Sequence, residues 1–143
     1  RGIEGARGKE SYKLMAERVG VPWRGRRYDR ANPQAADLAN QALNHAASAV
    51  EAAAAIAVSA TATVPQLGFI HEDPGQSFVL DIADLWRETV TLPCAFRAAK
   101  RAAERPDMPV ERIARRLTGE TLAKEGLIPA MIERIKALLE EGP

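Results

Sequence analysis

The chain has 143 residues, of which 46% are hydrophobic, 27% charged and 5% aromatic, a composition typical of one globular domain. It contains no apolar run of roughly 20 residues, as a membrane span needs, and no secretory signal in residues 1–10. A single cysteine excludes an internal disulfide and a multi-cysteine zinc site. With a net charge of +1, nucleic-acid binding would depend on local patches. We expect a cytoplasmic protein without membrane contact and, because Arg1 is not an initiator methionine, a fragment with residues missing upstream.

The predicted elements of the first half are two helices and a loop between them. Residues 1–19 carry an imperfect apolar stripe that ends at Gly20, and glycine and proline make residues 20–33 typical of a loop. From Pro33 to about Ala60, alanine dominates without a further glycine or proline. This pattern predicts one long central helix, which Asn32 caps and Pro33 begins.

The second half is predicted to be a series of shorter helices. After a loop over residues 61–76, Ser77 caps a helix to about residue 87, and Pro93 begins the next, to about residue 105. Asp107 caps a helix over residues 109–117, residues 118–121 form a turn, and Pro129 breaks or restarts a final helix that ends near Glu141. Because almost no segment has a strand pattern, the predicted fold class is all-α, a single helical domain over residues 1–143 with one long central Ala-rich helix.

Two aspartates stand out on the helix predicted over residues 77–87. Asp81 and Asp84 are three residues apart and therefore share a helix face. Their apolar neighbours would make burial costly without a cation, an arginine or a helix N-terminus to compensate. His71, ten residues upstream in a Gly/Pro-rich loop, could join them, because imidazole and carboxylates are ligands of Mn²⁺, Mg²⁺, Zn²⁺ or Fe²⁺. The alternatives are two solvated aspartates and a loop histidine bonded to backbone.

The loop over residues 23–30 combines aromatic and basic side chains. Four arginines, at positions 24, 26, 27 and 30, alternate with Trp23 and Tyr28, which fits phosphate contacts and base stacking as well as it fits a solvated basic loop. A second basic region over residues 97–116 contains interspersed acids and is interpreted as a salt-bridged surface. His45, among the alanines of the central helix, is interpreted as structural. No G-x-S-x-G, Walker, dinucleotide-binding or zinc-deaminase pattern is present.

Five sequence blocks occur in an order that identifies a resemblance. They are RGIEGAR at residues 1–7, WRGRRYD at 23–29, DLANQ at 37–41, GFIH at 68–71 and SFVLDIAD at 77–84. Together they resemble the C-terminal helical catalytic domain of the CRISPR-associated integrase of spacer acquisition, the Cas one family, in its type I-E-like form. The resemblance covers nearly the whole chain.

The resemblance implies a metal-dependent DNA endonuclease and integrase that uses Mg²⁺ or Mn²⁺ to join prespacer DNA to a CRISPR repeat by transesterification. It also implies a homodimer that works with the smaller adaptation protein, Cas two, and an upstream β-rich domain that is not among these 143 residues. Family metal ligands map to Glu4, His71 and Asp84, and Asp81 is a further catalytic position. Without the resemblance, Glu4 would be an ordinary glutamate favoured near a helix start.

The expected DNA-binding residues are basic or aromatic: Arg1, Arg26, Arg27, Tyr28 and Arg87. Some relatives carry tyrosine where Glu51 and Leu80 stand here, so any role of those tyrosines is not transferred. Two alternatives use the same residues differently. One is a non-catalytic helical DNA-binding or scaffold module, and the other is a helical metallohydrolase that acts on a small phosphoester.

Overall fold

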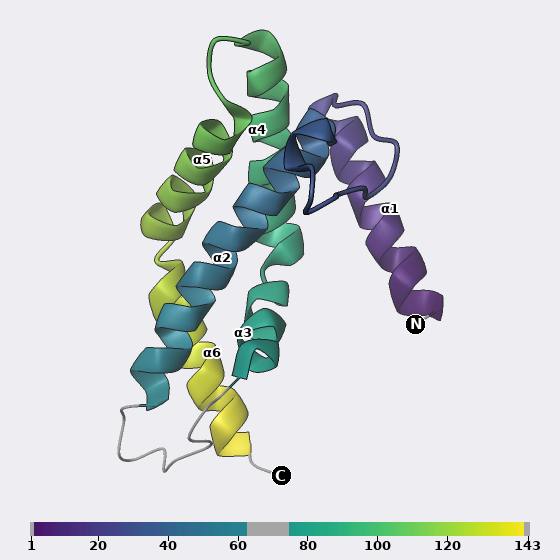
Figure 1. Cartoon of the computed structure of the whole chain (residues 1–143). Coiled ribbons are helices and arrows are strands. Elements are labelled where there is room, and N and C mark those ends of the chain that lie inside the picture. The colour runs from purple at the N-terminus through teal and green to yellow at the C-terminus, as the bar shows by residue number, and fades with distance from the viewer. Residues whose placement is uncertain (1, 63–74, 142–143) are drawn as a thin grey trace.

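The computed structural model describes residues 2–62 and 75–141, and every regular element within these ranges is helical (Figure 1). The all-α prediction is therefore confirmed for the described part of the chain. In chain order the elements are α1 (Gly2–Val19), the short 3₁₀ helix η1 (Pro33–Ala35), α2 (Leu38–Ala62), α3 (Gly75–Asp84), the π-helical turn η3 (Arg87–Thr91), α4 (Leu92–Glu104), α5 (Val110–Lys124) and α6 (Leu127–Glu141). Within the described ranges, no helix has the length and apolarity needed to cross a membrane.

The axis of the fold is α2, which packs against α3, α4, α5 and α6. Figure 1 shows it running through the middle of the bundle. Its 25 residues span roughly 37 Å at about 1.5 Å each. Alanine side chains at its buried positions let neighbouring helices approach closely, as at Ala42, Ala46, Ala53, Ala54 and Ala57. The prediction of a long, central, alanine-rich helix is confirmed.

The start of this helix differs from the prediction. The residues from Pro33 form the separate η1 turn, and the Asn32 side chain makes no capping hydrogen bond. Asp37 provides the cap instead, because its Oδ1 accepts the backbone N–H of Asn40 at 2.8 Å. The predicted start at Pro33 is therefore wrong: the chain is extended at Ala36 before the cap at Asp37 starts the helix.

The connection between α3 and α4 contains the π-helical turn. Pro93 lies in the first turn of α4, where it has no N–H to donate to the carbonyl four residues earlier and its ring would crowd that carbonyl. The wider turn of η3 avoids this conflict, and the Leu92 N–H reaches the Arg87 carbonyl five residues back. Because α3 begins at Gly75, Ser77 lies inside the helix, and the prediction that it is the cap is wrong.

The predicted turn at residues 118–121 is also wrong, because α5 continues through it to Lys124. The hydroxyls of Thr118 and Thr121 donate to carbonyls four residues earlier, at 2.7 and 2.9 Å, and so remain compatible with the helix. The break comes instead at Gly126, whose φ of 60° is unfavourable for other residues. Pro129 lies in the first turn of α6, where its missing N–H costs no hydrogen bond.

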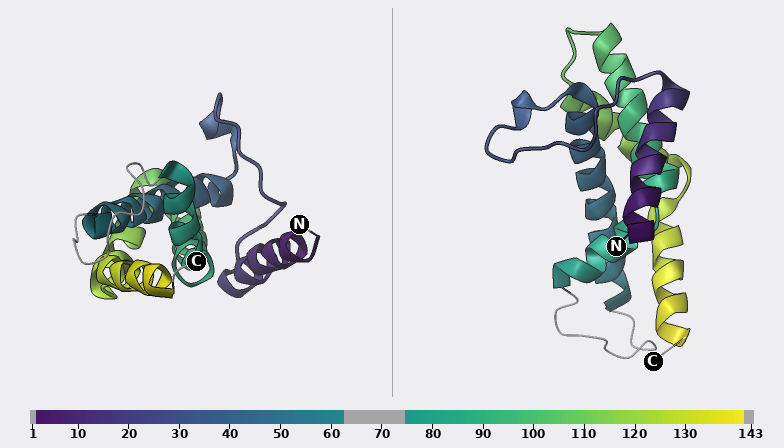
Figure 2. Two further views of the ribbon diagram at one scale, coloured as in Figure 1. Left: turned by 90° about the horizontal axis from the view of Figure 1, so that it is seen from below. Right: turned by 90° about the vertical axis from the view of Figure 1, so that its right-hand side faces the viewer.

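The buried side chains form two clusters along α2. The first joins its N-terminal half to α1, α4 and α5 around Leu43 and Phe96. The second joins its C-terminal half to α3 and α6 around Ile82, Met131 and Ile135. Figure 2 shows α1 standing apart from the other helices, and it packs mainly on α4. Beside α1, residues of α2, α3 and η3 line a hollow.

Candidate active site

The hollow is a pocket of about 290 Å³ lined by residues of α1, α2, α3, η3 and the loop before α2. Its charged lining consists of Asp81 and Asp84 from α3, Glu51 from α2, Arg87 from η3 and Arg26 from the loop. Three carboxylates and two guanidinium groups therefore share one small volume. Such a site combines ligands for a cation with donors for a phosphate.

The two aspartates of α3 face the pocket together, as their spacing predicts. The residues between them, Ile82 and Ala83, are buried in the second core cluster, so the opposite face of α3 holds the helix in place. Asp81 and Asp84 are exposed, the Asp84 side chain by 61%. The expected cost of burying these carboxylates therefore does not arise, and their position at the pocket is the stronger argument for function.

Arg87 lies one turn beyond Asp84 and forms an ion pair with it, with 3.3 Å between Nη1 and Oδ1. Its Nε is buried and has no hydrogen-bond partner within the described residues. A Cβ atom added at Gly8 of α1 would lie 4.0 Å from Arg87 Nη2, an ordinary contact distance, so this part of α1 lies directly beside the guanidinium. Nearby, the Ser11 hydroxyl of α1 donates to Glu88 Oε1 at 2.8 Å. These contacts dock α1 against η3 at the edge of the pocket.

Arg26 is positioned by Asn40, a completely buried residue in the first turn of α2. Asn40 Oδ1 accepts Arg26 Nη1 at 2.8 Å and the Arg27 N–H at 2.9 Å. Its Nδ2 donates to the Gly25 carbonyl and to Asp37 Oδ1, both at 2.9 Å. One side chain thus satisfies four polar groups and ties the basic loop to the start of α2. Sequence reasoning missed this role, and the only available signal was the asparagine of the DLANQ block, at the start of the alanine-rich helix.

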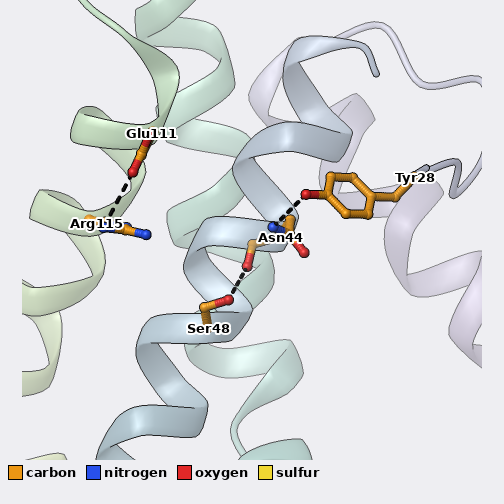
Figure 3. A network of polar contacts seen from close by, with 5 residues as sticks. All are labelled: Tyr28, Asn44, Ser48, Glu111 and Arg115. Atoms are coloured by element: carbon orange, nitrogen blue, oxygen red, sulfur yellow. Dashed lines mark hydrogen bonds and ion pairs between the residues drawn. The ribbon is translucent and has the colours of Figure 1, made fainter. Parts of the chain in front are cut away.

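Tyr28 lies farther along the same loop and is fixed by α2. Its hydroxyl accepts a hydrogen bond from Asn44 Nδ2 at 3.1 Å, and the Asn44 carbonyl accepts one from Ser48 at 2.9 Å (Figure 3). The Arg26 guanidinium lies 6.0 Å from the ring centroid, at the outer limit of a cation–π contact. Tyr28 also lines a second hollow of about 500 Å³, which shares Arg26 and Glu51 with the first. The two hollows therefore form adjoining spaces along α2.

The remaining aromatic of the loop has a structural position. The Trp23 ring stacks on Tyr12 of α1, with centroids 5.3 Å apart, and meets Phe96 of α4 edge-on at 5.3 Å. Trp23 is part of the core packing, so neither of the two interpretations left open for the loop, base stacking or a solvated basic loop, describes this residue. Arg24, Arg27 and Arg30 are exposed.

Several predicted site residues have no described side chain. Glu4 lies on α1, but its side chain is outside the described part of the structure. Arg1 and His71 are outside the described residues altogether. Within the described residues, no group of three or more histidine, cysteine, aspartate or glutamate side chains is arranged to hold a metal ion. The ligand set Glu4, His71 and Asp84 therefore stays a prediction.

His45 lies on α2, is half buried, and is not among the residues that line the pocket. Burial lowers the pKa of its imidazole from the usual 6.5, and neighbouring Arg115 adds to this effect while Glu111 opposes it. Glu111 and Arg115 form an ion pair of 3.3 Å, drawn in Figure 3. The interpretation of His45 as structural agrees with this position.

Part of the second basic region is a salt-bridged surface, as predicted. The pairs are Arg105 with Asp107, Arg115 with Glu111 and Arg116 with Glu120, at 3.2 to 3.4 Å. All are exposed and contribute little to stability.

The comparisons with known proteins agree with the resemblance. The profile of a family described as "CRISPR associated protein Cas1" matches residues 1–125. The "CRISPR-associated endonuclease Cas1 1" of Rhodospirillum rubrum is 38% identical over 144 residues, which are 99% of this chain and 46% of the relative. The "CRISPR-associated endonuclease Cas1" of Escherichia coli K12 is 39% identical over 100% of this chain and 47% of its own length.

A solved structure resembles the whole chain. The crystal structure of a TtCas1-DNA complex superposes with a TM-score of 0.82 and 39% identity, over 100% of this chain and 52% of that one. A crystal structure of TtCas1 gives a TM-score of 0.70 and 38% identity, over 93% of this chain and 48% of that one. The chain thus spans about half the length of the curated relatives and solved structures that it matches.

Proposed function

Because this chain belongs to the Cas1 family, we propose that it is the catalytic domain of a metal-dependent DNA endonuclease and integrase. In this proposal it inserts prespacer DNA into a CRISPR array. The observation that carries the proposal is the meeting of Asp81 and Asp84 with Arg26 and Arg87 in one pocket. The presence of DNA in the crystal structure of a similar protein supports DNA as the substrate.

The side chains that line the pocket give it a net negative charge, which favours the binding of a divalent cation, although the described side chains alone do not complete a set of three ligands. Three carboxylates, of Glu51, Asp81 and Asp84, face two guanidinium groups, of Arg26 and Arg87, so negative charge is in excess before any ligand binds. Carboxylate oxygens are the ligands that Mg²⁺ and Mn²⁺ prefer.

We assign the metal to Asp84 together with Glu4 and His71, following the family, with Asp81 beside them. The described backbone supports the assignment of Glu4 as a metal ligand, because Glu4 precedes Gly8 by one helical turn on α1. Gly8 lies next to the Arg87 guanidinium, which is paired with Asp84. The helix that carries Glu4 therefore runs along the edge of the pocket.

The proposed reaction needs no protein nucleophile. The 3′-hydroxyl of the prespacer forms a bond to a phosphorus of the repeat, and the bond from that phosphorus to its 3′-oxygen breaks. The attacking hydroxyl loses a proton, and the departing oxygen gains one. A bound Mg²⁺ or Mn²⁺ supplies two things here: it lowers the pKa of the attacking hydroxyl and neutralises charge on the phosphate.

The basic residues of the pocket hold the DNA backbone in this proposal. The pair between Arg87 and Asp84 is solvent-exposed and therefore weak, so a phosphate can take the place of the carboxylate on Arg87. Arg26 is held in place by Asn40 and presents its guanidinium to both adjoining hollows. Arg1, Arg27 and Tyr28 complete the proposed DNA contacts. A homodimer and the smaller protein Cas two are the partners that the family implies.

The test is a strand-transfer and cleavage assay with a duplex oligonucleotide that carries 3′ overhangs. We expect products with Mg²⁺ or Mn²⁺, none with EDTA, and none from Asp84→Asn. Asp107→Asn, which removes an exposed aspartate far along the chain, is the matched control and keeps activity. Products in EDTA, or equal activity of the two variants, would refute the mechanism. DNA binding that ignores both metal and Asp84, with no reaction, would favour the non-catalytic DNA-binding or scaffold module.

A further inference from the structure

A separate groove, of about 470 Å³, lies between α1 and α4 and shares no residue with the candidate active site. We name it the α1–α4 groove and define it by the residues that line it: Met15, Arg18, Val19, Pro93, Arg97, Lys100, Arg101, Glu104 and Leu117. Tyr12 of α1 faces the active site, whereas the next turns of the same helix face this groove. No step of the proposed reaction uses it.

The groove is strongly basic. Arg18, Arg97, Lys100 and Arg101 oppose a single carboxylate, that of Glu104, so the groove has a net charge of +3 whereas the whole chain has +1. None of the four cations forms an ion pair within the part of the chain that the structure describes. This differs from α5, where arginines pair with glutamates one turn away. Concentrated and unneutralised positive charge favours a negatively charged ligand.

The floor of the groove is aliphatic. It is formed by Met15, Val19, Pro93 and Leu117, and one turn before Arg18 the Leu14 side chain is 52% exposed. No aromatic side chain lines the groove. Single-stranded nucleic acids bind proteins largely by stacking their bases on aromatic rings, which this groove lacks. A sugar–phosphate backbone gains little from aliphatic contacts. A polypeptide that carries both acidic and apolar side chains gains from both parts of the surface.

We propose that the α1–α4 groove is a docking site for an acidic, amphipathic segment of a partner protein. Apolar side chains of the segment cover the aliphatic floor, and its carboxylates pair with the arginines and the lysine at the rim. Lys100 is exposed and spans the groove from α4 to the end of α1, since its Nζ would lie 4.0 Å from a Cβ atom added at Gly20. The proposal does not depend on the metal or on catalysis.

The test uses a synthetic helical peptide of about 18 residues with leucine at every third or fourth position and glutamate elsewhere. Its binding to the chain is followed by fluorescence anisotropy at moderate salt. We expect saturable binding that weakens by about tenfold or more in Arg97→Glu/Arg101→Glu. The control with equal charge change is Arg112→Glu/Arg134→Glu, on exposed positions outside the groove, and it retains most of the affinity. Circular dichroism establishes that both variants keep their helices.

Two further probes separate the competing occupants. A peptide in which serine replaces every leucine tests the aliphatic floor, and we expect it to bind about tenfold more weakly than the parent peptide. A duplex and a single-stranded oligonucleotide test nucleic acid. Equal affinities of the two double variants for the leucine peptide, or of the two peptides for the chain, would overturn the proposal. The proposal would also be overturned if Arg97→Glu/Arg101→Glu lowered the affinity for the oligonucleotides but left the affinity for the leucine peptide unchanged. Binding of the peptide to Asp84→Asn must equal binding to the parent chain, which separates this test from that of catalysis.

Discussion

Replacing Asn40 with alanine removes the residue that ties the basic loop to α2. The substitution takes away four side-chain hydrogen bonds of 2.8 to 2.9 Å, two accepted and two donated. It also leaves the Gly25 carbonyl and the Arg27 N–H without the partners they have in the native chain. A hydrogen bond contributes about 0.5–1.5 kcal/mol net, and more where a charged group takes part. Because water can reach part of the loop, we expect a loss of about 2–4 kcal/mol in the free energy of unfolding.

The assay is urea unfolding followed by circular dichroism, with Asn44→Ala as the matched control. Asn44 stands one turn farther along the same helix, and its side chain makes one neutral hydrogen bond, to Tyr28 at 3.1 Å. The control should lose about 1 kcal/mol. The Asn40 variant should also bind DNA more weakly than the control at equal folded fraction, because Arg26 is no longer held at the pocket. Equal stability losses in the two variants would refute the interpretation of Asn40.

Two further predictions concern helix continuity and pH. Gly119→Ala should raise the free energy of unfolding by about 0.5–1 kcal/mol, because Gly119 lies inside α5 with open space around its Cβ position; a decrease in thermal midpoint would contradict the helical assignment of residues 118–121. His45, whose pKa is lowered in the folded state, binds a proton first in the unfolded chain as the pH falls below 6.5. This group should therefore leave the free energy of unfolding unchanged above pH 6.5 and should lower it as the pH falls below 6.5. The decrease should be smaller in His45→Gln than in the parent chain. Identical pH profiles of the thermal midpoint in these two proteins would contradict this prediction.

Local patterns in the sequence predict the aspartate pair well and its surroundings less well. The spacing of Asp81 and Asp84 places them on one face, and both line the pocket. The same pattern does not reveal that the buried face of α3 holds Val79, Ile82 and Ala83 and leaves both aspartates exposed, which removes the expected cost of burying the carboxylates. That cost depends on how the helix is rotated against α2 and α6, which is set by tertiary packing.

The basic loop shows more clearly where local reasoning fails. Trp23 looks like a stacking residue beside four arginines, but Tyr12 and Phe96, from helices on either side in sequence, enclose it. Asn40 bonds to loop residues 13 to 15 positions earlier, so its role becomes visible only when the loop folds back. Pro93, in contrast, carries a local signal for the altered turn before α4, because proline cannot continue an α-helix from the preceding residues.

The central claim is that the acidic pocket holds a divalent cation through Asp84. Isothermal calorimetry with Mn²⁺ tests it most directly, on the chain, on Asp84→Asn and on the control Asp107→Asn. The account predicts saturable binding at one site in the parent chain and in the control, and no binding in Asp84→Asn. Equal binding by all three proteins would show that Asp84 is not a ligand. Absence of binding by the parent chain would contradict a metal site in this pocket.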